Sequence, residues 1–225
     1  MDETVRLPGA AREKAPWTMS RVLPACGVVG GLLFIAVFLV EGAIRQGYDP
    51  IYHPVSALSL GDRGWIQVAS FLVTGSLMIG FAAGVRRALG STVGALLIGA
   101  FGAAQIVSGV FPMDPMRGYP PGAPLGDPVE TSWQHQAHDW GGVVVFFALP
   151  VACFVISRRL TGGWRAYTLL TGVAGLALFV WFGVAWEENA ANAGLIQRAA
   201  IVVDWGWVVL LALHLRRSTS HAEPR

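Results

Sequence analysis

The chain has 225 residues, of which 54% are hydrophobic and only 13% are charged. Soluble domains carry about 25% charged residues, so this composition leaves too little polar surface for a water-soluble globule. The formal net charge is +2 and is spread along the chain, so no nucleic-acid partner is implied. We therefore predict an integral membrane protein.

Six apolar stretches are long enough to cross a bilayer, which takes about 20 residues. In chain order they are Val22–Ile44, Trp65–Val85, Thr92–Phe111, Trp140–Ser157, Tyr167–Trp186 and Ile196–Leu215. Each run is continuously apolar rather than alternating, which favours helices over the strands of a barrel. We predict an all-α bundle of six transmembrane helices at 22–215, with tails at 1–21 and 216–225.

The distribution of basic residues predicts the orientation. Twelve of the sixteen lysines and arginines fall in the two tails and in the loops after the second and fourth stretches. Because cytoplasmic loops carry the excess of positive charge, we expect a multi-pass protein of the cell membrane with both termini in the cytoplasm. The loops at about 45–64, 112–139 and 187–198 would then face outward.

Polar residues that could form a site gather in these outward loops. His53 and Ser56 approach the second span, and Asp114 follows the third. His135 and His138 precede the fourth span, which Thr131 or Ser132 could cap. Two histidines three residues apart would share one helix face and could share a metal ion.

Charged residues within or beside the spans are a second group of candidates. Asp204 lies about 12 Å into the sixth span, counted at 1.5 Å per residue. A carboxyl group inside the membrane is costly and marks a site or a pathway by default. We expect its partner to be Arg198 or a group on a neighbouring helix. Glu187 is a further candidate, and we interpret Glu41 as an interfacial residue.

Four short strings occur in an order that resembles a known family. They are His53-Pro54-Val55-Ser56-Ala57-Leu58, Gly109-Val110-Phe111-Pro112-Met113-Asp114, His135-x-x-His138-x-x-Gly141 and Gly194-Leu195-Ile196-Gln197-Arg198. Together they resemble the bacterial membrane family known as domain of unknown function 998, over about residues 22 to 215. The resemblance implies a six-helix membrane protein and no established activity.

A weaker likeness concerns chemistry. The set of one serine, one aspartate and three histidines is similar to that of the alkaline ceramidases and progestin/adiponectin receptors, which are membrane hydrolases with a zinc ion on three histidines. Those proteins have seven spans and a late histidine pair spaced H-x-x-x-H, so we use the likeness as an analogy.

Two hypotheses follow. In the first, the chain is a zinc-dependent hydrolase of a lipid-like amide or ester at the outer leaflet. Three histidines would hold the zinc, Asp114 would activate the bound water, and Ser56 would stabilise the oxyanion. Glu187 or Asp204 would orient one of the ligands. The three zinc ligands would be His53, His135 and His138.

In the second hypothesis, the chain is a small transporter or a ligand-binding membrane protein. Glu41, Glu187, Arg198 and Asp204 would line a polar cavity, and the histidines would titrate near neutral pH. A haem group held by two of the histidines is a variant of this reading. Membrane lipid is the expected partner in both hypotheses, and the oligomeric state stays open.

Overall fold

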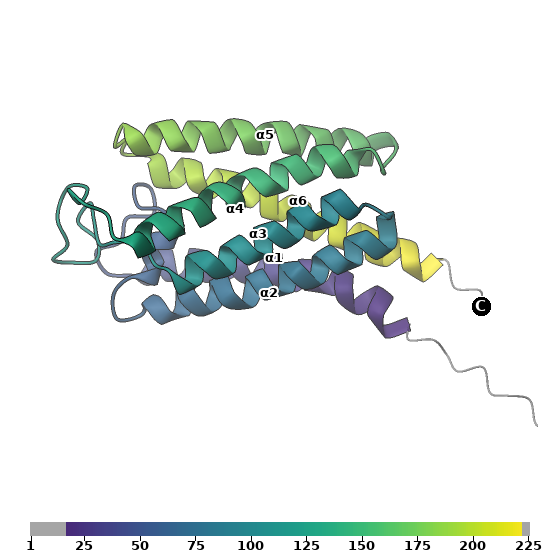
Figure 1. Ribbon diagram of the computed structural model, residues 1–225, viewed down its shortest axis with the longest axis horizontal. Helices are drawn as coiled ribbons and strands as arrows, with labels where there is room; N and C mark the ends of the chain where they lie inside the picture. Colours follow the sequence, from purple (N-terminus) through teal and green to yellow (C-terminus); the bar gives the residue numbers. More distant parts are fainter. Residues whose placement is uncertain (1–16, 222–225) are drawn as a thin grey trace, which may run out of the picture.

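The computed structural model describes residues 17–221 and is built from six long helices (Figure 1). They are α1 Trp17–Ile44, α2 Gly64–Leu89, α3 Thr92–Val110, α4 Trp133–Ser157, α5 Gly162–Glu187 and α6 Ala193–His221. A short 3-10 helix, η1, spans Val55–Ser59, and no β-strand occurs between residues 17 and 221. The predicted all-α six-helix fold is confirmed. Most of the two predicted tails lies outside the described residues.

Each of the six helices is long and apolar enough to cross a bilayer, so the chain is a multi-pass membrane protein. The predicted spans were too short at several ends. The largest difference is in α4, which begins at Trp133 rather than at Trp140. Its first two turns are polar, and apolar length alone therefore assigned them to a loop.

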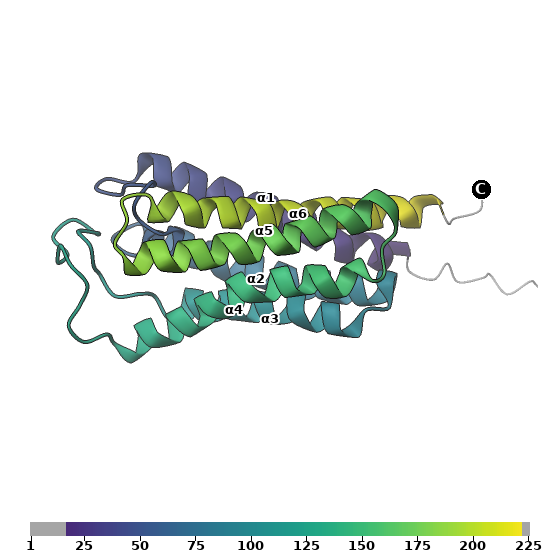
Figure 2. The ribbon, with the colours of Figure 1, turned by 90° about the horizontal axis from the view of Figure 1, so that it is seen from above.

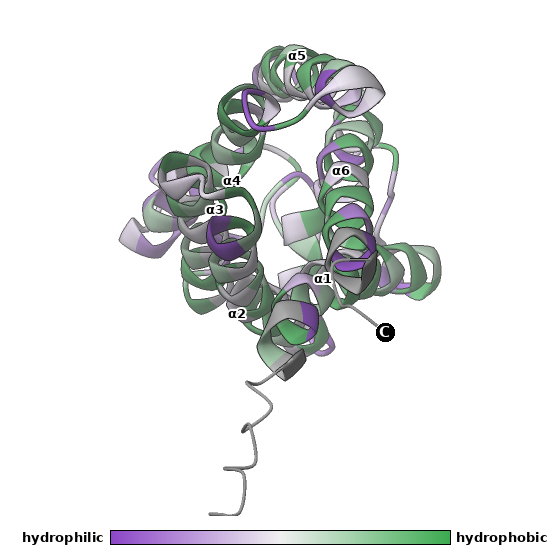
Figure 3. Ribbon diagram, turned by 90° about the vertical axis from the view of Figure 1, so that its right-hand side faces the viewer, coloured by the Kyte–Doolittle hydropathy of each residue, from purple (hydrophilic) through white to green (hydrophobic). Residues whose placement is uncertain are grey.

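The helices form a closed ring. Each helix packs against its neighbours in the sequence, and α6 completes the ring by packing against α1. Figure 3 shows this ring end-on. The most buried helix is α6, whose Trp205 stacks on Phe34 of α1 with the ring centroids 4.9 Å apart. The least buried is α5.

Helices α2 and α3 touch through their backbones. A Cβ atom built on Gly75 would lie 2.5 Å from the carbonyl oxygen of Gly102, and one built on Gly102 would lie 2.5 Å from the oxygen of Gly75. No side chain fits at that separation. Small residues at such crossings let helices in membranes approach closely.

The three longest connections, residues 45–63, 111–132 and 188–192, lie at one end of the bundle, which we call the long-loop end (Figures 1 and 2). Both ends of the described chain lie at the opposite end. Glu41 of α1 does not stand alone at the long-loop end, because it pairs with Arg45 at 2.7 Å and with Arg63 at 2.5 Å.

Candidate functional site

A cavity of about 290 Å³ lies inside the ring toward the long-loop end, and all six helices contribute to its wall. Seven aromatic side chains form most of the apolar wall: Phe34, Phe71, Phe146, Phe179, Phe182, Trp186 and Trp205. Eight polar side chains also line it: Ser56, Gln105, Ser108, His135, His138, Asp139, Glu187 and Gln197. Along α4 the lining extends from His135 to Phe146, about 16 Å at 1.5 Å per residue.

The exposure of the lining residues indicates that the mouth of the cavity lies between α4 and α5. Asp139 and Val143 on α4 and Glu187 on α5 are exposed, whereas the other lining residues are buried or half-buried. The two helices diverge toward the long-loop end (Figure 2). Val143 lies about 15 Å along α4 from its start, so the mouth continues into the part of the helix that would face lipid. We infer that the cavity opens between two helices toward the lipid, with the carboxylates of Asp139 and Glu187 at the edge of the mouth nearest the long-loop end.

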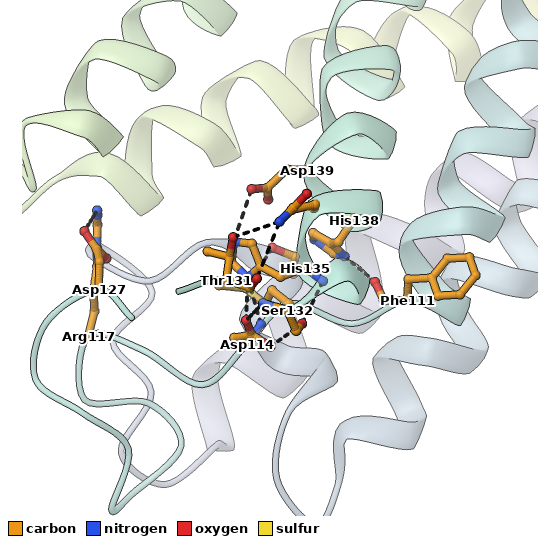
Figure 4. A network of polar contacts seen from close by, with 12 residues as sticks. Phe111, Asp114, Arg117, Asp127, Thr131, Ser132, His135, His138 and Asp139 are labelled. Atoms are coloured by element: carbon orange, nitrogen blue, oxygen red, sulfur yellow. Dashed lines mark hydrogen bonds and ion pairs between the residues drawn. The ribbon is translucent and has the colours of Figure 1, made fainter. Parts of the chain in front are cut away.

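A closed set of hydrogen bonds fixes the start of α4 beside the cavity (Figure 4). The Oγ of Ser132 accepts from the His135 amide at 3.1 Å, which is the N-cap predicted for this helix. The Ser132 amide and hydroxyl both donate to the Asp114 carboxylate at 2.7 Å. The Asp114 amide in turn donates to Nδ1 of His135 at 2.8 Å.

The charge of Asp114 is stabilised by this arrangement. Partial burial opposes ionisation, but the hydrogen bonds from Ser132 outweigh it and hold the pKa of Asp114 below its usual value. Asp114 does not line the cavity. Both carboxylate oxygens accept hydrogen bonds from Ser132 at the helix start, and from this place outside the lining the carboxylate does not fit the role of water-activating base in the cavity.

His135 has both ring nitrogens engaged. Since Nδ1 accepts from an amide, the proton of the neutral ring is on Nε2, which faces the Asp139 carboxylate at 3.1 Å. The ring therefore links the Asp114 backbone to a carboxylate at the mouth of the cavity.

Of the three predicted zinc ligands, only His138 presents a free imidazole nitrogen. Its Nδ1 lies 2.9 Å from the carbonyl oxygen of Phe111 and 3.1 Å from that of Ser108. Carbonyl oxygens only accept, so Nδ1 carries the proton and Nε2 has a free lone pair. Within the described chain Nε2 has no hydrogen-bond partner, and the residue lines the cavity.

His53 is a structural residue in this arrangement. Its Nδ1 accepts from the Asp49 amide at 2.9 Å, and its Nε2 donates to the carbonyl oxygen of Arg117 at 3.1 Å. The ring packs against Tyr48 and Tyr119. It therefore joins the first long loop to the second and does not line the cavity.

The predicted zinc ligands do not fit a zinc ion as they are placed. A tetrahedral catalytic zinc needs three protein ligands with free lone pairs. Five of the six ring nitrogens of His53, His135 and His138 are already engaged, and only Nε2 of His138 is free. Among the described residues, no group of three histidine, cysteine or acidic side chains could hold a metal.

Arg198 and Asp204 do not pair, contrary to the expectation from their spacing. Six residues on a helix correspond to about 240° around its axis, so the two side chains point in different directions. Arg198 donates to the carbonyl oxygens of His53 and Gly194, each at 3.0 Å, and to the hydroxyl of Tyr48. Burial raises the pKa of Tyr48 to about 12, so its hydroxyl stays protonated.

Asp204 is buried on a different side of α6, against α5. A Cβ atom built on Gly175 would lie 2.5 Å from its Oδ1 and 2.8 Å from the ring of Pro150. Oδ1 has no hydrogen-bond partner within residues 17–221, and no cation of that part of the chain pairs with the carboxyl group. Asp204 does not line the cavity, although the next residue, Trp205, does.

Arg117 fastens the second long loop beside the mouth. Its guanidinium forms a bidentate pair with Asp127 at 2.5 and 2.8 Å (Figure 4). It also donates to the carbonyl oxygen of Trp186 at 2.9 Å and lies 3.7 Å from the centroid of that ring. The pair with Arg117 holds the pKa of Asp127 below its usual value.

Of the residues predicted from the sequence, the structure gathers Ser56, His135, His138 and Glu187 around one cavity. It leaves four others, His53, Asp114, Arg198 and Asp204, outside the lining.

Sequence reasoning missed the lining glutamines. Gln105 accepts a hydrogen bond from the Thr74 hydroxyl at 3.3 Å, and Gln197 accepts one from the Val55 amide at 2.7 Å. An uncharged amide in an apolar span was the available signal for Gln105.

The model of a family described as protein of unknown function, DUF998, matches residues 28–214. No curated protein and no solved structure matches the chain. The family match confirms the resemblance carried by the four sequence strings and covers most of the six-helix ring. The comparisons give no support to the likeness with the ceramidase-type hydrolases.

Proposed function

The chain belongs to the family of proteins of unknown function DUF998, and from its cavity we propose that it binds a single-chain amphiphile of the membrane. The observation that carries this proposal is a cavity whose exposed lining residues all lie on α4 and α5. Ligand sites typically occupy about 300–1,000 Å³, so a cavity of about 290 Å³ takes a small ligand or part of a larger one.

The lining suits a molecule with an apolar chain and one polar head. Lipid tails are as apolar as the aromatic wall, so burying a chain there gains little free energy over leaving it in the bilayer. Selectivity then comes from the few polar groups near the long loops, as in most ligand sites. These include the free Nε2 of His138, the amide of Gln105 and the hydroxyl of Ser56.

In the orientation predicted from the basic residues, the long-loop end lies at the outer, non-cytoplasmic face of the membrane. A ligand would then enter from the outer leaflet, with its chain passing Val143 and its head between Asp139 and Glu187. The proposal contains no zinc step, because the engaged ring nitrogens leave the metal a single ligand. It corresponds to the binding hypothesis drawn from the sequence rather than to the hydrolase hypothesis.

Fluorescence quenching tests the proposal, because Trp205 lies in the cavity wall. The protein in phosphatidylcholine nanodiscs would be titrated with dodecyl amphiphiles that carry a nitroxide on the chain. One probe has a primary ammonium head, one a neutral amide head and one a phosphate head. We expect at least one probe to give a saturable component of quenching that is reduced in Trp205→Phe and absent when Trp186, which also lines the cavity, is replaced by Phe as well.

Two glycines provide a matched pair of blocking and control variants. A Cβ atom on Gly142, which lines the cavity, or on Gly183 of α5, which does not, would meet no atom within 4 Å. Gly142→Phe should therefore fill the mouth and abolish saturable quenching, whereas Gly183→Phe should leave it unchanged. Equal binding by both variants, or no saturable quenching with any probe, would refute the proposal.

A further inference from the structure

We infer that the cavity selects an amphiphile with a positively charged, ammonium-type head. This inference rests on the proposed function and adds to it the chemical class of the ligand. It is carried by the charge of the lining, by the charges around the mouth and by the aromatic wall.

The lining keeps a net negative charge whenever at least one of its two histidines is neutral. Asp139 and Glu187 contribute two carboxylates at the rim. His138 uses its proton on two carbonyl oxygens, and His135 can add at most one positive charge beside Asp139. None of the arginines in residues 17–221 lines the cavity. An anionic head would therefore meet repulsion, while a cationic head would be attracted.

The arginines closest to the site do not reverse this sign. Arg117, which lies against the lining residue Trp186, is neutralised by the bidentate pair with Asp127. Arg198 is directed toward Tyr48 and the first long loop, on the α1 side of the ring. The mouth lies on the other side, between α4 and α5, where Glu188 follows Glu187 at the helix end.

The aromatic wall favours the same sign of charge. The faces of aromatic rings attract cations, and the attraction strengthens where water is excluded. Trp186 already holds the Arg117 guanidinium over its ring at 3.7 Å. The free lone pair on Nε2 of His138 offers an acceptor for an N–H of the head group, in keeping with an ammonium ligand.

The three nitroxide probes test this inference directly, since they share a chain and differ only in the head group, which is cationic, neutral or anionic. Their concentrations in the membrane would be normalised with a tryptophan octyl ester in empty nanodiscs. We expect the ammonium probe to half-saturate the Trp205-dependent quenching at a concentration about tenfold below the amide probe, which is the size of one well-placed charge interaction. The phosphate probe should give the weakest binding.

Two neighbouring glutamates give a matched pair of variants. Glu187 lines the cavity and Glu188 does not, although both are exposed. Glu187→Gln should weaken binding of the ammonium probe several-fold and leave the amide probe unchanged, while Glu188→Gln should alter neither. If all three probes half-saturate at the same concentration, the preference for a cationic head is refuted, but the proposal that the cavity binds an amphiphile is not. Absence of saturable quenching with every probe would overturn the proposed function itself.

Discussion

Replacing Asp114 should loosen the start of α4 and with it the polar rim of the cavity. The carboxylate accepts two hydrogen bonds from Ser132, and hydrogen bonds to charged groups contribute about 1.5–3 kcal/mol each. The side chain is 25% exposed, so water replaces part of what is lost. We expect Asp114→Ala to lower the free energy of unfolding by about 2–4 kcal/mol, and Asp114→Asn by about half as much, because one oxygen acceptor remains.

The pH dependence of this contribution has a defined sign. The pKa of Asp114 is lower in the folded protein than its usual value of about 3.9. Such a group stabilises the fold fully above the unfolded-state pKa and loses that effect as pH falls through the folded-state pKa. The difference in stability between the wild type and Asp114→Asn should therefore be constant from neutral pH to about pH 5 and shrink below about pH 4.

Thermal unfolding in detergent and hydrogen exchange would measure the effect. We expect the melting temperature to fall by several degrees, and the amides of Ser132 and His135 to exchange faster in Asp114→Ala. Glu130→Gln is the control, because Glu130 is an exposed acid two residues before the cap. Unchanged exchange at both amides, or a stability difference from Asp114→Asn as large at pH 3 as at pH 7, would refute this account of the helix start.

Three further substitutions test other parts of the structure. Gly102→Ala should lower the free energy of unfolding by about 1–3 kcal/mol, because the added methyl group forces α2 and α3 apart. Gly99→Ala, whose Cβ would have no neighbour nearer than 3.9 Å, should leave stability unchanged. Equal melting temperatures of the two variants would contradict this prediction. His53→Ala should lower the free energy of unfolding by about 2–4 kcal/mol, because it leaves two backbone groups without hydrogen-bond partners. It should leave the zinc content unchanged, and a loss of zinc in elemental analysis would contradict this assignment of His53. Asp204→Leu should raise stability by about 1–3 kcal/mol, since it removes an unpaired buried carboxyl group; a loss of stability would mean that the carboxyl has a partner.

The fold followed from the sequence because lipid imposes one strong requirement on it. Every backbone polar group in the bilayer must be bonded internally, so an apolar run of about 20 residues is a helix with few alternatives. The same reasoning failed at the start of α4. There Ser132 caps a polar turn, and His135 and Asp139 lie on a helix although the polar composition of this segment is typical of a loop.

The site was predicted only in part, because residue type does not specify which hydrogen bonds a side chain makes. His135 and His138 share a helix face, as their spacing predicts, and both line the cavity. His53 has the same chemistry but is used to hold two loops together. The aromatic wall could not be predicted from the sequence, because an apolar span does not distinguish a phenylalanine that faces the cavity from one that faces lipid.

The closure of the ring by α1 and α6 bears on how the protein is assembled during synthesis. Among the six helices of the ring, α1 is made first, and one of its two neighbours, α6, is made last. Until α6 inserts, Phe34 of α1 lacks its stacking partner Trp205, and the cavity lacks the part of its wall formed by Gln197, Ile201 and Trp205. A nascent chain that stops after α5 would therefore expose the interior of the ring to lipid. Ligand binding in the cavity would thus report that all six helices of the ring have been made and inserted.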